Sequence, residues 1–159
     1  MRSRGFTMIE LVTVIAIIGA LAVLVLPRLN VAGFQRYAFR QQLLAGLRYA
    51  QKTAMASGCE VQVDLIASSD TFALHYRSGG SSTGCGSGSF TAPVTDPTGG
   101  GAFTRSAGSE LDLVTDGAIR FDGRGTSVQI STGTPKITAI QFANAPTIFV
   151  DAATGYIHE

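Results

Sequence analysis

The chain has no tryptophan, only two cysteines and two histidines, and few charged residues for its length of 159. Charged side chains make up 14% of it, whereas about a quarter is usual in globular proteins. No nucleophile can be paired with a base, and the cysteines lack the nearby Cys or His partners that zinc requires. We therefore expect no enzymatic activity, no catalytic residue and no cofactor.

Metal ligands are also scarce. Asp112, Asp116 and Asp122 lie near predicted turns, but they lack the dense spacing of oxygen ligands that a calcium-binding loop needs. Turn formation explains all three aspartates, so we expect no metal site.

Acidic residues are nearly absent from the first third of the chain. Residues 1–58 contain seven Arg or Lys and one acid, whereas residues 59–159 contain five basic and ten acidic residues. An acidic C-terminal part argues against a general nucleic-acid-binding protein, because phosphate binding needs a basic folded surface.

What the chain does have is a long apolar run over residues 8–26. As a helix this run is about 28 Å long, close to the hydrocarbon thickness of about 30 Å. Basic residues precede it, which favours a cytoplasmic N-terminus. A secretory signal has its small-residue cleavage site after the apolar region, whereas here the small residue Gly5 comes before it. The run therefore predicts a transmembrane segment that is not a conventional signal peptide.

One carboxylate, Glu10, interrupts the apolar run. An ionised acid at the centre of a membrane helix costs about 2.5–3.5 kcal/mol, and less toward the helix end. Glu10 is therefore either a functional residue or an interfacial residue that reaches the lipid headgroups.

Beyond Pro27, a helical pattern predicts an amphipathic segment that ends at Ser57-Gly58. We expect one helix of about 50 residues, in which Pro27 introduces a kink or local loosening. Its apolar face in the second half comprises Phe39, Leu43, Leu47, Ala50 and Ala54.

After Gly58 the pattern changes to that of strands. Residues 59–65 and 72–76 predict a hairpin, and 77–109 form a long Gly/Ser-rich loop. Further strands are expected at 111–115, 118–122, 126–131, 137–142 and 146–150, with a turn at 144–146 and a short strand at the end. The fold class is α+β, with a long N-terminal helix packed on an antiparallel β head.

The two cysteines, Cys59 and Cys85, both lie in this head. If the head is exported from the cytoplasm, a disulfide bond between them is expected, and two unrelated buried thiols are the alternative.

Residues 5–27, GFTMIELVTVIAIIGALAVLVLP, resemble the N-terminus of type IV pilins and type II secretion pseudopilins. The head is similar to minor pilins of the GspH/FimT type, including MSHA-like ones. Four segments carry this similarity: AGLRYAQKTA (45–54), CEVQV (59–63), FDGRG (121–125) and ATGYIH (153–158).

The resemblance implies four parts: a leader at 1–5, a transmembrane and assembly half-helix at 6–28, an amphipathic half-helix at 29–58 and a β head at 59–159. It implies cleavage by a prepilin peptidase between Gly5 and Phe6, followed by N-methylation of Phe6. Glu10 would then pair with the N-terminal amine of a neighbouring subunit, and Pro27 would mark local melting of the helix within a filament.

The implied function is that of a structural minor pilin or pseudopilin that helps to prime a type IV pilus or a type II secretion pseudopilus. Its partners would be other major and minor pilins and the inner-membrane assembly platform. The protein would lie in the bacterial inner membrane with its head in the periplasm before assembly. Two alternatives stay open: a pilus-tip receptor for DNA or a surface, and a signal-anchored exported protein outside any filament.

Overall fold

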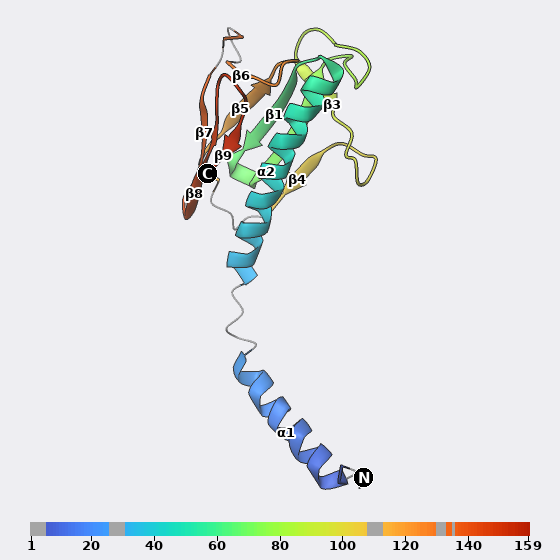
Figure 1. The fold of residues 1–159 in the computed structure, drawn as a ribbon, viewed down its shortest axis with the longest axis vertical. Helices are drawn as coiled ribbons and strands as arrows, with labels where there is room; N and C mark the ends of the chain where they lie inside the picture. Colours follow the sequence, from blue (N-terminus) through green and yellow to red (C-terminus); the bar gives the residue numbers. More distant parts are fainter. Residues whose placement is uncertain (1–5, 26–30, 108–112, 130–132, 135) are drawn as a thin grey trace, which may run out of the picture. The chain divides into compact units, whose positions relative to one another are not determined.

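The computed structural model describes residues 6–25, 31–107, 113–129, 133–134 and 136–159. The chain divides into two compact units, Met1–Phe34 and Gln35–Glu159, and each is described by itself. Figure 1 shows the order of the helices and strands along the chain.

Two helices occupy the region where one long helix was expected. Helix α1 comprises Met8–Val25 and helix α2 comprises Val31–Ser57. Pro27, with the predicted kink, lies outside the described residues. Helix α2 ends where Gly58 adopts a left-handed conformation with φ +68°, as is common directly after a helix.

The larger sheet has the strand order β3-β2-β1-β5-β6, with β4 pairing with β2. The predicted hairpin is confirmed: β1 (Val61–Ile66) and β2 (Thr71–Arg77) pair antiparallel, with Val61 opposite Tyr76. A short 3-10 turn, Ala67–Ser69, joins them. The remaining strands are β3 (Phe90–Pro93), β4 (Thr104–Ser106), β5 (Gly117–Phe121) and β6 (Ser127–Val128). The long loop after β2 thus contributes β3 and β4 to the sheet.

The smaller sheet has the order β7-β8-β9, formed by β7 (Thr138–Phe142), β8 (Ala145–Val150) and β9 (Ile157–His158). The predicted turn is formed, but at 143–144 and not at 144–146, because Ala145 and Pro146 already belong to β8. The pairing register of β7 with β8 shifts between Ile140 and Phe142, opposite Pro146. This irregularity accommodates a residue that has no N–H to donate.

The strand predicted at 111–115 is not formed over the described residues 113–115. Leu113 is buried and makes only an isolated bridge with Phe142. The strand predicted at 126–131 is shortened to β6, and residues 130–132 lie outside the described part.

A single hydrophobic core joins α2 to both sheets. All five predicted apolar residues of α2 are buried, and Leu43 and Leu47 are fully enclosed. They pack on inward-facing side chains of the larger sheet, and the rings of Phe39 and Phe72 meet edge to face at 5.7 Å. Burial of each such leucine contributes about 1.5–3 kcal/mol. Ile140, Ile148 and Val150 bring the smaller sheet into the same core. The α+β fold class is confirmed.

Candidate functional site

The predicted assembly residue Glu10 lies in the first turn of α1. Thr7 precedes the helix, and its carbonyl oxygen accepts hydrogen bonds from the amides of Glu10 (3.1 Å) and Leu11 (3.2 Å). The Glu10 amide also lies 3.4 Å from the Thr7 hydroxyl. Thr-x-x-Glu is the residue pattern of a helix capping box, and a carboxylate in the first turn interacts favourably with the helix dipole. Sequence reasoning missed Thr7, although this spacing was the signal that identifies it.

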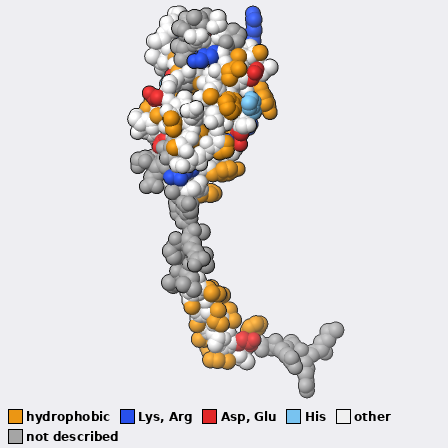
Figure 2. All heavy atoms as spheres, turned by 90° about the vertical axis from the view of Figure 1, so that its left-hand side faces the viewer, with side chains coloured by type: hydrophobic (Ala, Val, Ile, Leu, Met, Phe, Trp, Pro, Cys, Tyr) orange, Lys and Arg blue, Asp and Glu red, His pale blue; other side chains and the backbone are white. Residues whose placement is uncertain are grey.

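The surface of α1 is apolar on all sides. Figure 2 shows its side chains coloured almost entirely as hydrophobic, with one acidic group. Phe6 and nine further large apolar side chains are exposed: Met8, Ile9, Leu11, Val12, Val14, Ile15, Ile17, Ile18 and Leu21. A helix that is hydrophobic all round is normally buried in a membrane or in a bundle of other helices.

Two observations concern the predicted membrane segment and the predicted cleavage position. Within the described ranges, no helix is both long enough and apolar enough to cross a membrane. The predicted cleavage residue Gly5 lies outside the described residues, whereas Phe6 is 78% exposed just before α1.

The predicted disulfide bond is confirmed between Cys59 and Cys85. Beside it, the Arg77 Nε donates to the Glu60 carboxylate at 2.7 Å, and the Arg77 Nη1 donates to the Gly88 carbonyl at 2.7 Å. The covalent bond and the arginine therefore fasten the loop after β2 to the residues that precede β1 and to the end of β2.

Three of the segments that carry the family resemblance meet at one side chain of α2. The Gln51 amide donates to the carbonyl oxygen of Gly125 at 2.9 Å and to that of Thr154 at 2.9 Å. Gly155 has φ +62°, and a Cβ there would lie 2.0 Å from the Gly125 oxygen. We call this arrangement, made by Gln51, Gly125, Thr154 and Gly155, the Gln51 clamp. It joins the turn after β5 to the turn after β8 and ties both turns to the helix.

Of the three aspartates predicted near turns, Asp122 shapes the turn after β5. The Asp122 Oδ1 accepts hydrogen bonds from the amides of Arg124 and Thr126, both at 2.9 Å. Asp116 accepts from the amide of Ala67 at 3.1 Å, while Asp112 lies outside the described residues. Over the described part of the chain, no three Asp, Glu, His or Cys side chains gather as metal ligands would.

The two histidines occupy different surroundings. The His75 Nδ1 lies 2.7 Å from the Asp64 Oδ2 on the side of the sheet that faces away from α2. His158 lies between the rings of Phe149 and Tyr156, with both ring centres at 5.6 Å. Among the described residues, neither histidine makes a hydrogen bond to a serine, threonine or cysteine side chain.

Comparison with known families identifies the family of the chain. The family model of the type II transport protein GspH matches residues 40–153. The chain belongs to the GspH family. The prokaryotic N-terminal methylation motif matches residues 1–26, the part that precedes the GspH match. No curated protein and no solved structure gives a significant match.

Membership of the GspH family, together with the methylation motif, assigns the chain a structural role as a pilin or pseudopilin of type II secretion or type IV pili. The family is non-enzymatic, and its members associate with other pilins or pseudopilins in a filament. The predicted resemblance to GspH-type minor pilins is therefore confirmed, whereas its MSHA-like variant stays a prediction.

Proposed function

We propose that this GspH-family protein is a minor subunit that is built into a filament through α1 and helps to prime filament assembly. One observation carries the proposal: α1 presents an exposed apolar surface on every side, with one carboxylate in its first turn. Burial of each large apolar side chain on that surface contributes about 1.5–3 kcal/mol. This surface therefore needs an apolar cover, either lipid or the α1 helices of neighbouring subunits. The transfer from lipid to a filament relies on close helix packing and on the pairing of polar groups, because lipid tails are as apolar as the side chains.

Before assembly, the same apolar segment holds the protein in the bacterial inner membrane with its head in the periplasm. An oxidising compartment agrees with the Cys59–Cys85 disulfide bond of the head. A prepilin peptidase removes residues 1–5, and the new N-terminal amine of Phe6 is methylated. The inner-membrane platform then transfers the subunit to the filament.

In this proposal, Glu10 selects for correctly docked subunits. No cation lies within salt-bridge distance of Glu10 among the residues that the structure describes, so its charge is available to another subunit. An unpaired charge in an apolar bundle is strongly penalised, whereas the N-terminal amine of a neighbour compensates it. Only a correctly docked subunit supplies that amine.

The test compares Glu10→Gln with Glu10→Asp in cells that express the full chain. The first variant keeps the shape of the side chain and removes the charge, and the second keeps the charge. Sheared filaments and inner membranes are immunoblotted, and the mass of the N-terminal peptide is recorded. We expect methylated Phe6 in the wild type, loss of Glu10→Gln from the filament fraction, and substantial retention of Glu10→Asp.

The fraction that contains the mature protein separates the two systems. Methylated Phe6 in sheared filaments favours a type IV pilus, and methylated Phe6 in the membrane alone favours a secretion pseudopilus. An intact leader, or equal incorporation of Glu10→Gln and wild type, would refute the proposal.

A further inference from the structure

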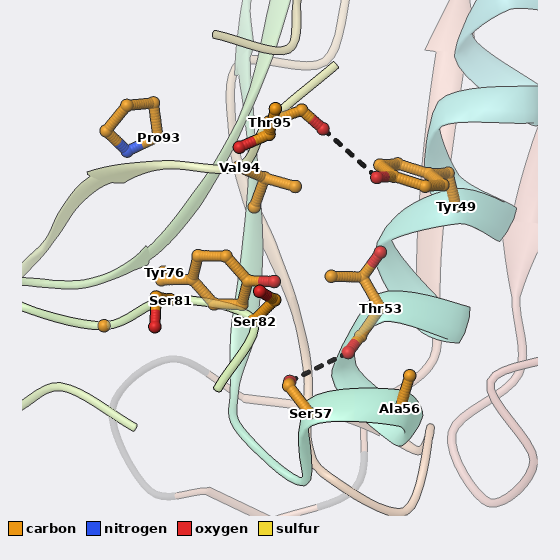
Figure 3. Close-up of a pocket in the computed structure, with 11 residues that line it drawn as sticks. Tyr49, Thr53, Ala56, Ser57, Tyr76, Ser81, Ser82, Pro93, Val94 and Thr95 are labelled. Atoms are coloured by element: carbon orange, nitrogen blue, oxygen red, sulfur yellow. Dashed lines mark hydrogen bonds between the residues drawn. The ribbon is translucent and has the colours of Figure 1, made fainter. Parts of the chain in front are cut away.

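The head contains a groove of about 410 Å³ between the C-terminal half of α2, the start of the loop after β2 and the segment after β3. Figure 3 shows this groove and the side chains around it. Most of the lining residues carry a hydroxyl group: Tyr49, Thr53, Ser57, Tyr76, Ser81, Ser82 and Thr95. The volume falls within the 300–1,000 Å³ range of small-molecule sites.

Tyr76 forms the floor of the groove and is only 4% exposed. Among the described residues, its hydroxyl makes no hydrogen bond, and it is not one of the buried unpaired atoms, so it opens into the groove. In Figure 3 the hydroxyl points toward the helix side of the groove. Burial raises the pKa of Tyr76, and the neighbouring Tyr49 raises it further, so the group stays a neutral donor at physiological pH. A ligand in the groove would replace solvent as its hydrogen-bond partner.

The other hydroxyls divide into two kinds. Tyr49 donates to the Thr95 carbonyl at 3.1 Å, and Ser57 donates to the Thr53 carbonyl at 2.8 Å, so these two shape the wall. In the described part of the chain, the hydroxyls of Thr53 and Ser82 make no hydrogen bond. The Ser81 hydroxyl pairs with Thr83, whereas the Thr95 hydroxyl makes no hydrogen bond among the described residues. With Tyr76, four hydroxyls of the lining are therefore uncommitted.

The chemistry of the lining restricts the ligand. No Asp, Glu, Lys, Arg or His side chain from the described residues lines the groove, so a charged ligand would lose its hydration without gaining a counter-charge. Each hydroxyl can both donate and accept a hydrogen bond. The matching ligand is neutral and presents closely spaced groups that also donate and accept.

We propose that this groove binds a neutral saccharide, whose hydroxyls pair with those of Tyr76, Thr53 and Ser82. A peptide segment is the weaker match, because peptides bind most readily along a free strand edge through main-chain groups. Here the uncommitted groups are side-chain hydroxyls on the floor and the walls. The proposal does not depend on filament assembly, so its failure would leave the proposed function untouched.

The disulfide bond preorganises one wall. Gly80 and Ser82 lie inside the loop that Cys59–Cys85 closes. The loop is compact, because a Cβ on Gly86 would lie 2.4 Å from the Gly80 nitrogen. Reduction should loosen this wall and weaken binding, since a preorganised site avoids the cost of ordering the loop.

The test uses the purified full chain in a detergent without a sugar headgroup. The probes are neutral oligosaccharides of glucose, galactose, mannose or N-acetylglucosamine, and an uncharged Ser/Ala peptide. Binding is followed by ligand-observed NMR and by tyrosine emission, which no tryptophan obscures because the chain has none. We expect Tyr76→Phe to weaken saccharide binding about tenfold, as for one lost hydrogen bond, and Tyr156→Phe, outside the groove, to have no effect.

Thr53→Val and reduction of the disulfide bond should each weaken binding several-fold, while the circular dichroism of Tyr76→Phe stays that of the wild type. The proposal is overturned if no oligosaccharide binds the wild type at millimolar concentration. It is equally overturned if Tyr76→Phe binds as the wild type does, or if the peptide binds and the saccharides do not.

Discussion

Replacing Gln51 by methionine should destabilise the head through the loss of two specific hydrogen bonds. The Gln51 amide is the donor to both Gly125 and Thr154, which are separated from it by 74 and 103 residues. Methionine has a similar length and volume, so the packing of the side chain is largely kept. What the variant removes is the donor group, and two carbonyl oxygens lose a partner.

The expected loss of stability follows from those two hydrogen bonds. A hydrogen bond contributes about 0.5–1.5 kcal/mol net, so the expected loss in the free energy of unfolding is about 1–3 kcal/mol. For a chain of this size, 1 kcal/mol corresponds to about 2–4 °C, so the melting temperature should fall by roughly 2–12 °C. The assay is thermal unfolding of the purified full chain in detergent, followed by circular dichroism.

Two further variants sharpen this test. Gln41→Met changes an exposed glutamine of the same helix and should alter stability by less than about 0.5 kcal/mol. Gln51→Glu places a carboxylate against two carbonyl oxygens, which raises the pKa of the new acid in the folded state. Its destabilisation should therefore be largest at neutral pH and should lessen as the pH falls through that raised value. A melting temperature of Gln51→Met equal to that of Gln41→Met would refute the clamp.

Three other predictions concern the head. The pKa of Asp96 is lowered to about 2, first by a backbone amide and then by neighbouring hydroxyl and guanidinium groups. The ionised Asp96 therefore contributes fully to stability above about pH 4, and this contribution is lost as the pH falls toward 2. In Asp96→Asn the free energy of unfolding should depend less on pH in that window than in the wild type. Parallel pH profiles of the two proteins would contradict this. Replacing Cys59 and Cys85 together by serine should lower the free energy of unfolding in urea by about 3–4 kcal/mol, and an unchanged midpoint would contradict it. Gly46→Ala should cost about 1–3 kcal/mol, despite the better helix propensity of alanine, because a Cβ there would lie 2.5 Å from the Phe72 ring; a stabilised variant would show that the ring moves aside.

Much of the head could be predicted from local periodicity. The helical spacing of apolar residues from Phe39 to Ala54 identified the buried face of α2, and alternation identified β1 and β2. These patterns succeed because burial on one face imposes them directly on the sequence. The strand expected at 111–115 is not formed at the described residues 113–115, although Leu113 is buried. One isolated bridge to Phe142 is enough to bury that side chain, so an apolar residue did not require a strand.

Some of the candidate site residues could also be predicted from the sequence, and others could not. Glu10 could be found from the sequence alone, since a carboxylate in an apolar run is conspicuous. Gln51 could not, because it is an ordinary helix residue by composition and its two partners lie far away along the chain. The Tyr76 hydroxyl was equally hidden, since alternation along β2 predicts that the ring is buried and says nothing of its unpaired oxygen.

The division of the chain into two units predicts that folding and assembly can be separated by mutation. The Gln35–Glu159 unit has its own core, a disulfide bond and the Gln51 clamp, so its stability does not depend on burying α1. The exposed apolar side chains of α1, in contrast, contribute free energy only when another apolar environment covers them. Changes at Gln51 should therefore shift the unfolding of the head while assembly persists up to the temperature at which the head melts. The Glu10→Gln change should abolish incorporation into filaments while the melting temperature of the head stays that of the wild type. A Glu10→Gln variant whose head melts earlier would show that the two units are coupled, and loss of assembly would then no longer report on the charge alone.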